Sequence, residues 1–194
     1  SRPGLLSLIL GGTLLVSASA SSQHTITWLV EERGYPFPRA AFLSAAITLA
    51  AGLAGSLGIG ALTDRARRRG PGARLVALAL LAAAGLAAAL AFYRLPTTST
   101  FFVPAWVLAQ AWLLGWYGSL IAAIDEMAPA GARASVIGFA LLVVNLLGVA
   151  TGPYVTGLVG DRVSLGAGLA WSLAPAAAGA ALVASVGLAE MRRG

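Results

Sequence analysis

The chain has 194 residues, of which 58% are hydrophobic and 10% are charged. Soluble domains are about 45–50% apolar and about 25% charged, so this composition indicates an integral membrane protein. The net charge of +6 is the balance of 13 basic residues, all arginine, and 7 acidic residues. The arginines flank apolar runs and form no basic face with interspersed aromatic residues, as a nucleic-acid site would need. With no cysteine and one histidine, neither disulfide, thiolate or metal chemistry nor a cofactor is expected.

Six apolar runs can each cross a hydrocarbon core of about 30 Å as a helix of about 20 residues. Short connections rich in Gly and Pro, such as residues 34–38 and 95–98, separate the runs. We therefore expect an all-α, polytopic membrane protein with residues 1–194 in a single six-helix bundle. The expected helices span Leu5 to Val30, Ala40 to Leu62, Arg74 to Phe92, Phe101 to Ile124, Ala134 to Val159 and Leu165 to Leu188.

The first run also imitates a secretory signal peptide, because Arg2 precedes it and Ala18-Ser19-Ala20 resembles a cleavage site. The apolar run continues to Val30, and its removal would leave five helices. We therefore expect the first helix to be retained.

The arginines are divided unevenly between the two ends of the expected helices. By the positive-inside rule, the richer end is cytoplasmic, which places both termini on the cytoplasmic side of a cell (inner or plasma) membrane. The richer end carries Arg2, Arg65, Arg67, Arg68, Arg69, Arg74, Arg133, Arg192 and Arg193, and the other end carries Arg33, Arg39, Arg94 and Arg162.

A short motif occurs twice, at a spacing of half the chain. Gly60-Ala-Leu-Thr-Asp64-Arg65 returns as Gly157-Leu-Val-Gly-Asp161-Arg162, with the two aspartates 97 positions apart. Units 1–97 and 98–194 each hold three helices, an odd number, so the second unit must be inverted relative to the first. We expect the inverted 3+3 repeat of one transporter half.

The first copy, with Gly60, Asp64, Arg65, Arg68 and Arg69, resembles the cytoplasmic loop motif of the major facilitator superfamily, although Arg67 stands where the family usually has a second glycine. Two later stretches look like the C-terminal half of such a transporter. They are Pro129-Ala-Gly-Ala-Arg133, and Asn145-Leu-Leu-Gly148 with Gly152-Pro153. The second stretch is similar to both spinster-like lipid transporters and organic-anion symporters.

The resemblance implies a twelve-helix carrier of which this chain, beginning at Ser1 without Met, is the C-terminal half. A missing N-terminal six-helix half is therefore an expected partner, besides the lipid bilayer. The resemblance also implies that Gly60, Asp64, Arg65, Arg68 and Arg69 form a cytoplasmic gate, with Asp64 at a helix N-terminus, where a carboxylate is favoured. In the alternative interpretation, the arginines only fix topology and bind anionic lipid.

Polar side chains are concentrated on the first, fourth and fifth expected helices, and such groups normally face protein or water rather than lipid. We expect five of them to line a substrate cavity: His24, Trp28, Gln110, Tyr117 and Asn145. Thr13, Ser17 and Ser21 share the helix face of His24, and their hydroxyls could instead satisfy backbone groups. Asp125 and Glu126 are expected at a solvated helix end beside Arg133.

The leading hypothesis is a secondary transporter that moves a small organic or amphipathic solute by alternating access, with proton or sodium coupling left open. A spinster-like lysolipid transporter, and a six-helix scaffold or channel, are the alternatives. An intramembrane serine protease using Ser119 and His24 is disfavoured, because nothing places a base beside that serine. We expect a protein that is not an enzyme.

Overall fold

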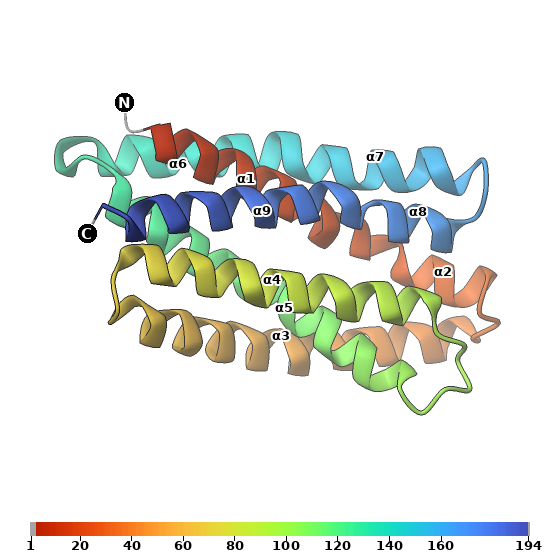
Figure 1. Ribbon diagram of the computed structural model, residues 1–194. Coiled ribbons are helices and arrows are strands. Elements are labelled where there is room, and N and C mark those ends of the chain that lie inside the picture. Colours follow the sequence, from red (N-terminus) through yellow and green to blue (C-terminus); the bar gives the residue numbers. More distant parts are fainter. Residues whose placement is uncertain (1–2, 194) are drawn as a thin grey trace.

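The computed structural model describes residues 3–193, and that part of the chain is helical with no strand (Figure 1). Within it, six helical segments are long and apolar enough to cross a membrane, as expected for a multi-pass membrane protein. The first segment comprises α1 (Pro3–Ser21), η1 (Ser22–His24) and α2 (Thr25–Glu31). The next three are α3 (Phe37–Arg67), α4 (Pro71–Arg94) and α5 (Phe102–Met127). The fifth comprises η2 (Ala130–Ala132), α6 (Arg133–Val143), η3 (Val144–Gly148) and α7 (Val149–Gly160), and the sixth comprises α8 (Leu165–Trp171) and α9 (Leu173–Met191).

The turn between α3 and α4 shows how the sequence sets the helix ends. Gly70 has a φ of +125°, which residues with a Cβ rarely adopt. Pro71 follows as the first residue of α4, where its missing N–H leaves no hydrogen bond unmade. However, α3 continues to Arg67, beyond the expected end at Leu62, so Asp64 lies on the helix rather than in a loop.

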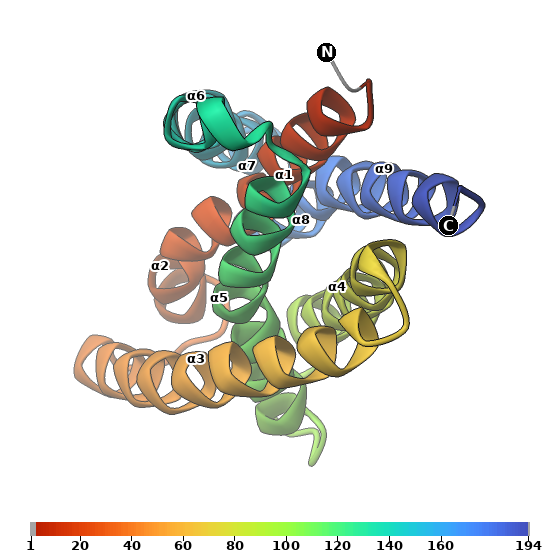
Figure 2. The ribbon, with the colours of Figure 1, turned by 90° about the vertical axis from the view of Figure 1, so that its left-hand side faces the viewer.

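The segments extend along a common direction, with the start of α1, the end of α9 and the α3–α4 and α5–α6 connections at one end (Figure 1). We call this the arginine-rich end, because Arg65 and Arg67 to Arg69 lie there, and the other the opposite end. α5 lies in the middle of the bundle and contacts α1, α3 and α4 (Figure 2). α4 packs along α9, and α1 packs against both α9 and α7. The margins are formed by α3 on one side and α6–α7 on the other.

Two glycines allow helices to approach each other closely. Gly55 of α3 lies against Ala111 of α5, where a Cβ on the glycine would overlap the alanine carbonyl. Gly152 of α7 lies against the backbone of Ser17 on α1 in the same way. Small residues at such crossings are typical of membrane helices, which associate through close packing.

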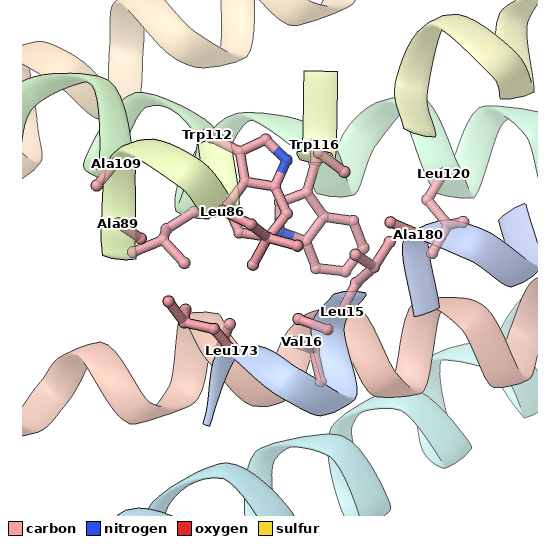
Figure 3. Close-up of a cluster of buried hydrophobic side chains, with 14 of the residues drawn as sticks. Leu15, Val16, Leu86, Ala89, Ala109, Trp112, Trp116, Leu120, Leu173 and Ala180 are labelled. Atoms are coloured by element: carbon pink, nitrogen blue, oxygen red, sulfur yellow. The ribbon is translucent and has the colours of Figure 1, made fainter. Parts of the chain in front are cut away.

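The interior is filled where α1, α4, α5 and α9 meet (Figure 3). Trp112 and Trp116 of α5 are buried there, with their ring centroids 6.4 Å apart. The indole N–H of Trp116 donates to the hydroxyl of Ser19 on α1 at 3.1 Å, and that hydroxyl donates to the Leu113 carbonyl at 2.7 Å. These hydrogen bonds fix the crossing of α1 and α5.

The two marginal segments present most of the exposed surface. In the most apolar stretches of α3 and of the fifth segment, 28% and 17% of the residues are buried, against 56% for the first segment and for α5. Many of the exposed side chains are large and apolar, including Phe42, Leu57, Phe139 and Leu146. Such a surface suits hydrocarbon or another membrane-embedded protein.

Candidate functional site

The charged side chains at the arginine-rich end form a network around Arg74. Arg74 lies one turn into α4, and its side chain is only 6% exposed. Its guanidinium donates to the carboxylate of Glu126 on α5 at 2.8 Å, and to that of Asp64 on α3. A buried charge needs such partners, because desolvation without them is costly. The network therefore ties three helices together at one point.

The two carboxylates differ in their surroundings. Glu126 is 24% exposed and also binds Nε of Arg67 at 2.7 Å, so it lies between two arginines. Asp64 is 68% exposed. The expected pairing with Arg133 is found for Asp125, at 3.9 Å, whereas its neighbour Glu126 pairs with Arg74 and Arg67.

A cleft of about 630 Å³ opens among these side chains, lined by Asp64, Arg67, Arg68, Glu126 and Arg133. Two of the expected gate residues, Asp64 and Arg68, thus lie at one cleft. The central residue of this site is Arg74, which was expected from the sequence only to mark membrane topology.

The remaining expected gate residues lie apart from the network. Arg65 and Arg69 are exposed and form no ion pair within the described residues. Gly60 makes no close helix contact, since no described atom lies within 4 Å of a Cβ built there, apart from its own helix and chain neighbours. Arg2, counted at this end from the sequence, lies outside the described residues.

Three of the expected cavity residues form two pairs along α5. Gln110 donates through Nε2 to the hydroxyl of Thr48 on α3 at 3.3 Å. Tyr117, two turns further along α5, accepts a hydrogen bond from Nδ2 of Asn145 in η3 at 3.1 Å. The amide of Asn145 also donates to the carbonyl of Leu141. α5 is therefore linked by polar side chains to α3 on one flank and to the fifth segment on the other.

A groove of about 280 Å³ lies between the first segment, α3 and α5. Within the described residues, the hydroxyl of Ser44 in its wall is buried and has no hydrogen-bond partner. Sequence reasoning missed Ser44 and Thr48, because neither belongs to a motif. The groove is lined by Ser22, Gln23, Thr25, Ile26, Ala41, Ser44, Ala45, Thr48, Gln110 and Leu114.

Of the five expected cavity residues, only Gln110 lines this groove. Trp28 is fully buried, with its ring 5.2 Å from that of Phe92 and 5.6 Å from that of Tyr93 on α4. His24 ends η1, and its Nε2 is buried without a partner among the described residues. The structure therefore does not gather the five expected residues at one place.

The hydroxyls that share the helix face of His24 follow the alternative interpretation. Thr13 donates to the carbonyl of Ile9, Ser17 to that of Leu14 and Ser21 to that of Ser17. All three are buried, where α1 meets η3 and α7. Their polar groups are satisfied within their own helix.

A second charged cluster lies at the opposite end, and no sequence motif pointed to it. The carboxylate of Glu32, which follows α2, accepts hydrogen bonds from the backbone N–H groups of Leu165 and Gly166 at the start of α8. Arg33 donates to the carbonyl of Tyr93 at 2.6 Å and lies over the ring of Trp28 at 4.6 Å. This cluster joins the first segment to α4 and α8, beside a cleft of about 460 Å³.

In the part of the chain that the structure describes, no group of three or more His, Asp or Glu residues could hold a metal ion. No family model matches the sequence, and no curated protein is significantly similar to it. The proposed function therefore depends on the arrangement of the helices and on the chemistry of their side chains.

Proposed function

We propose that the chain is the C-terminal six-helix half of a major facilitator superfamily transporter, which carries a small organic or amphipathic solute by alternating access. The observation that carries this proposal is the Arg74 network, which holds three helices together at one end through bonds that water can replace. Alternating access needs contacts of this kind at an end of the bundle that opens and closes.

The pairing of the helices supports the inverted repeat that this proposal requires. When segments one, two and three are exchanged with segments four, five and six, in that order, each main contact between two segments corresponds to another contact that is also present. The contact of α1 with α7 corresponds to that of α5 with α3, and the contact of α1 with α9 corresponds to that of α5 with α4. The contact between α4 and α9 corresponds to itself.

The 97-residue period also recurs in the packing, which further supports the repeat. Gly55 and Gly152, which each lie against the backbone of a neighbouring helix, are 97 positions apart. Ser19 and Trp116, which bind each other where α1 crosses α5, have the same separation. A contact between equivalent positions is expected on the axis that relates two repeats.

The polar side chains along α5 support a partner half. Leu114 and Gly118, which follow Gln110 at intervals of four residues on one face of α5, are exposed. Polar groups within a membrane normally face protein or water. An N-terminal half over this face would enclose them in a central cavity.

In this proposal, the arginine-rich end faces the cytoplasm of a cell membrane, and the Arg74 network is its gate. The network favours the arrangement in which α3, α4 and α5 lie close together. Loss of the Glu126 charge weakens that preference, so the equilibrium shifts towards the arrangement open at this end.

The test uses single cysteines in a protein without other cysteines, and this chain has none of its own. In membranes that contain the full native protein, a cysteine at Gly118 on α5 reports the arginine-rich half, and one at Gln23 reports the opposite half; both positions are exposed. Glu126→Gln should speed labelling of the first by a membrane-impermeant thiol reagent and slow labelling of the second. Glu190→Gln is the control and should change neither.

Reciprocal changes are the signature of a carrier. Equal changes at both positions, or none, would contradict the gate. Steady ion currents through the reconstituted protein would favour a channel.

A further inference from the structure

The groove between the first segment, α3 and α5 has the features of a ligand site. We propose that it binds a small uncharged solute that carries hydroxyl or amide groups. This rests on the proposed function for its role in transport, and it names the class of solute carried. With about 280 Å³, the groove lies just below the range of about 300–1,000 Å³ common for small-molecule sites.

The hydroxyl of Ser44 gives the first reason. Ser44 is 7% exposed, lines the groove, and its Oγ has no hydrogen-bond partner among the described residues. Buried polar groups in folded proteins are nearly always paired with protein, water or ligand. A hydroxyl or carbonyl group of a solute in the groove would complete this pairing.

Gln110 and Thr48 give the second reason. Gln110 is 6% exposed, and its Nε2 donates to the hydroxyl oxygen of Thr48 across the groove wall. In this orientation the Gln110 carbonyl oxygen is left as an acceptor, and the Thr48 O–H is left as a donor. Together with Ser44, the wall offers donors and an acceptor, the combination that recognises hydroxyl and amide groups.

The absence of charge from the wall gives the third reason. None of the ten side chains that line the groove is charged. The ion pairs of the described residues lie at the arginine-rich end, and at the opposite end Glu32 and Arg33 bind backbone groups. A charged solute in the groove would lose its water without gaining a counter-charge, which disfavours it strongly. Ile26 and Leu114 instead offer apolar surface to the carbon skeleton of an uncharged solute.

The experiment measures binding without transport. Ser44→Cys introduces one thiol of nearly the same size into the full native protein, and its labelling by a membrane-impermeant thiol reagent is followed with time. The probes are glycerol, myo-inositol and N-methylacetamide, with choline and succinate as charged comparisons. Thr98→Cys, in the exposed loop before α5, is the matched control for direct effects of the probes on the reagent.

We expect at least one uncharged probe to slow labelling at position 44, and not at position 98, by about tenfold at ten times its Kd, because only the unoccupied protein reacts. Gln110→Leu should abolish this protection when labelling with probe is compared with labelling of the same variant without probe. A thiol at position 44 that does not react, protection by none of the uncharged probes, or protection by choline or succinate would each overturn the proposal.

Binding and transport can fail separately. Protection at position 44 without reciprocal labelling at positions 118 and 23 would support the ligand site and contradict the proposed transport by alternating access. Reciprocal labelling without protection would support transport by alternating access and contradict the proposed ligand site.

Discussion

Glu126→Gln should lower the free energy of unfolding by about 2–3 kcal/mol, since it removes a charge that compensates the buried Arg74 guanidinium. Breaking a fully buried ion pair costs about 3–5 kcal/mol, and the smaller figure reflects the 24% exposure of Glu126. Asp64→Asn removes the other carboxylate charge. Because the Asp64 side chain is 68% exposed, water screens and replaces it, and we expect a loss of about 1 kcal/mol or less.

The assay is reversible unfolding by SDS in mixed micelles, followed by tryptophan fluorescence. Glu190→Gln is the control, because Glu190 is 26% exposed, much like Glu126, but its partner Arg193 is 64% exposed instead of buried. It should cost about 0.5 kcal/mol or less. Equal losses for Glu126→Gln and Glu190→Gln would refute the reasoning, since burial of the arginine would then not determine the energy. An Asp64→Asn loss as large as that of Glu126→Gln would refute it too.

Two further predictions concern helix packing. Gly55→Leu should prevent folding or lower the unfolding free energy by several kcal/mol, because its side chain meets the α5 backbone, whereas Gly58→Leu, which faces open space, should be tolerated when both are compared by SDS unfolding. Ser19→Ala should cost about 1–3 kcal/mol, because it leaves the Trp116 indole N–H buried without its acceptor. Ser185→Ala, which removes an exposed hydroxyl bound to its own helix, should cost almost nothing in the same measurement and would contradict this explanation if it cost as much.

The six helical segments could be predicted because each depends on local sequence. An apolar run of sufficient length must be helical in hydrocarbon. The turn between α3 and α4 is determined by two adjacent residues, Gly70 and Pro71. The end of α3 was missed because arginines can extend a helix beyond the hydrocarbon, where hydropathy no longer reports helical structure.

The candidate sites were harder to predict, because they depend on pairs distant in the chain. Arg74 and Glu126 are separated by 52 positions, and neither belongs to the motif that drew attention to Asp64. Hydroxyl residues were ambiguous for another reason. Ser17 and Thr48 look equivalent in sequence, but one satisfies its own helix backbone in a packed contact and the other lines a groove.

The distribution of charge has a consequence for motion. At the arginine-rich end, Arg74 joins α4 to α3 and α5, whereas at the opposite end Arg33 and Glu32 join the first segment to α4 and α8. α4 therefore takes part in both clusters, but its partners differ between the two ends. A movement of α3 and α5 away from α4 at the arginine-rich end breaks the Arg74 network and leaves the other cluster intact. The two ends are therefore held by different contacts, so the arginine-rich end can open while the opposite end stays closed, as alternating access requires, with the uncharged groove lying between them.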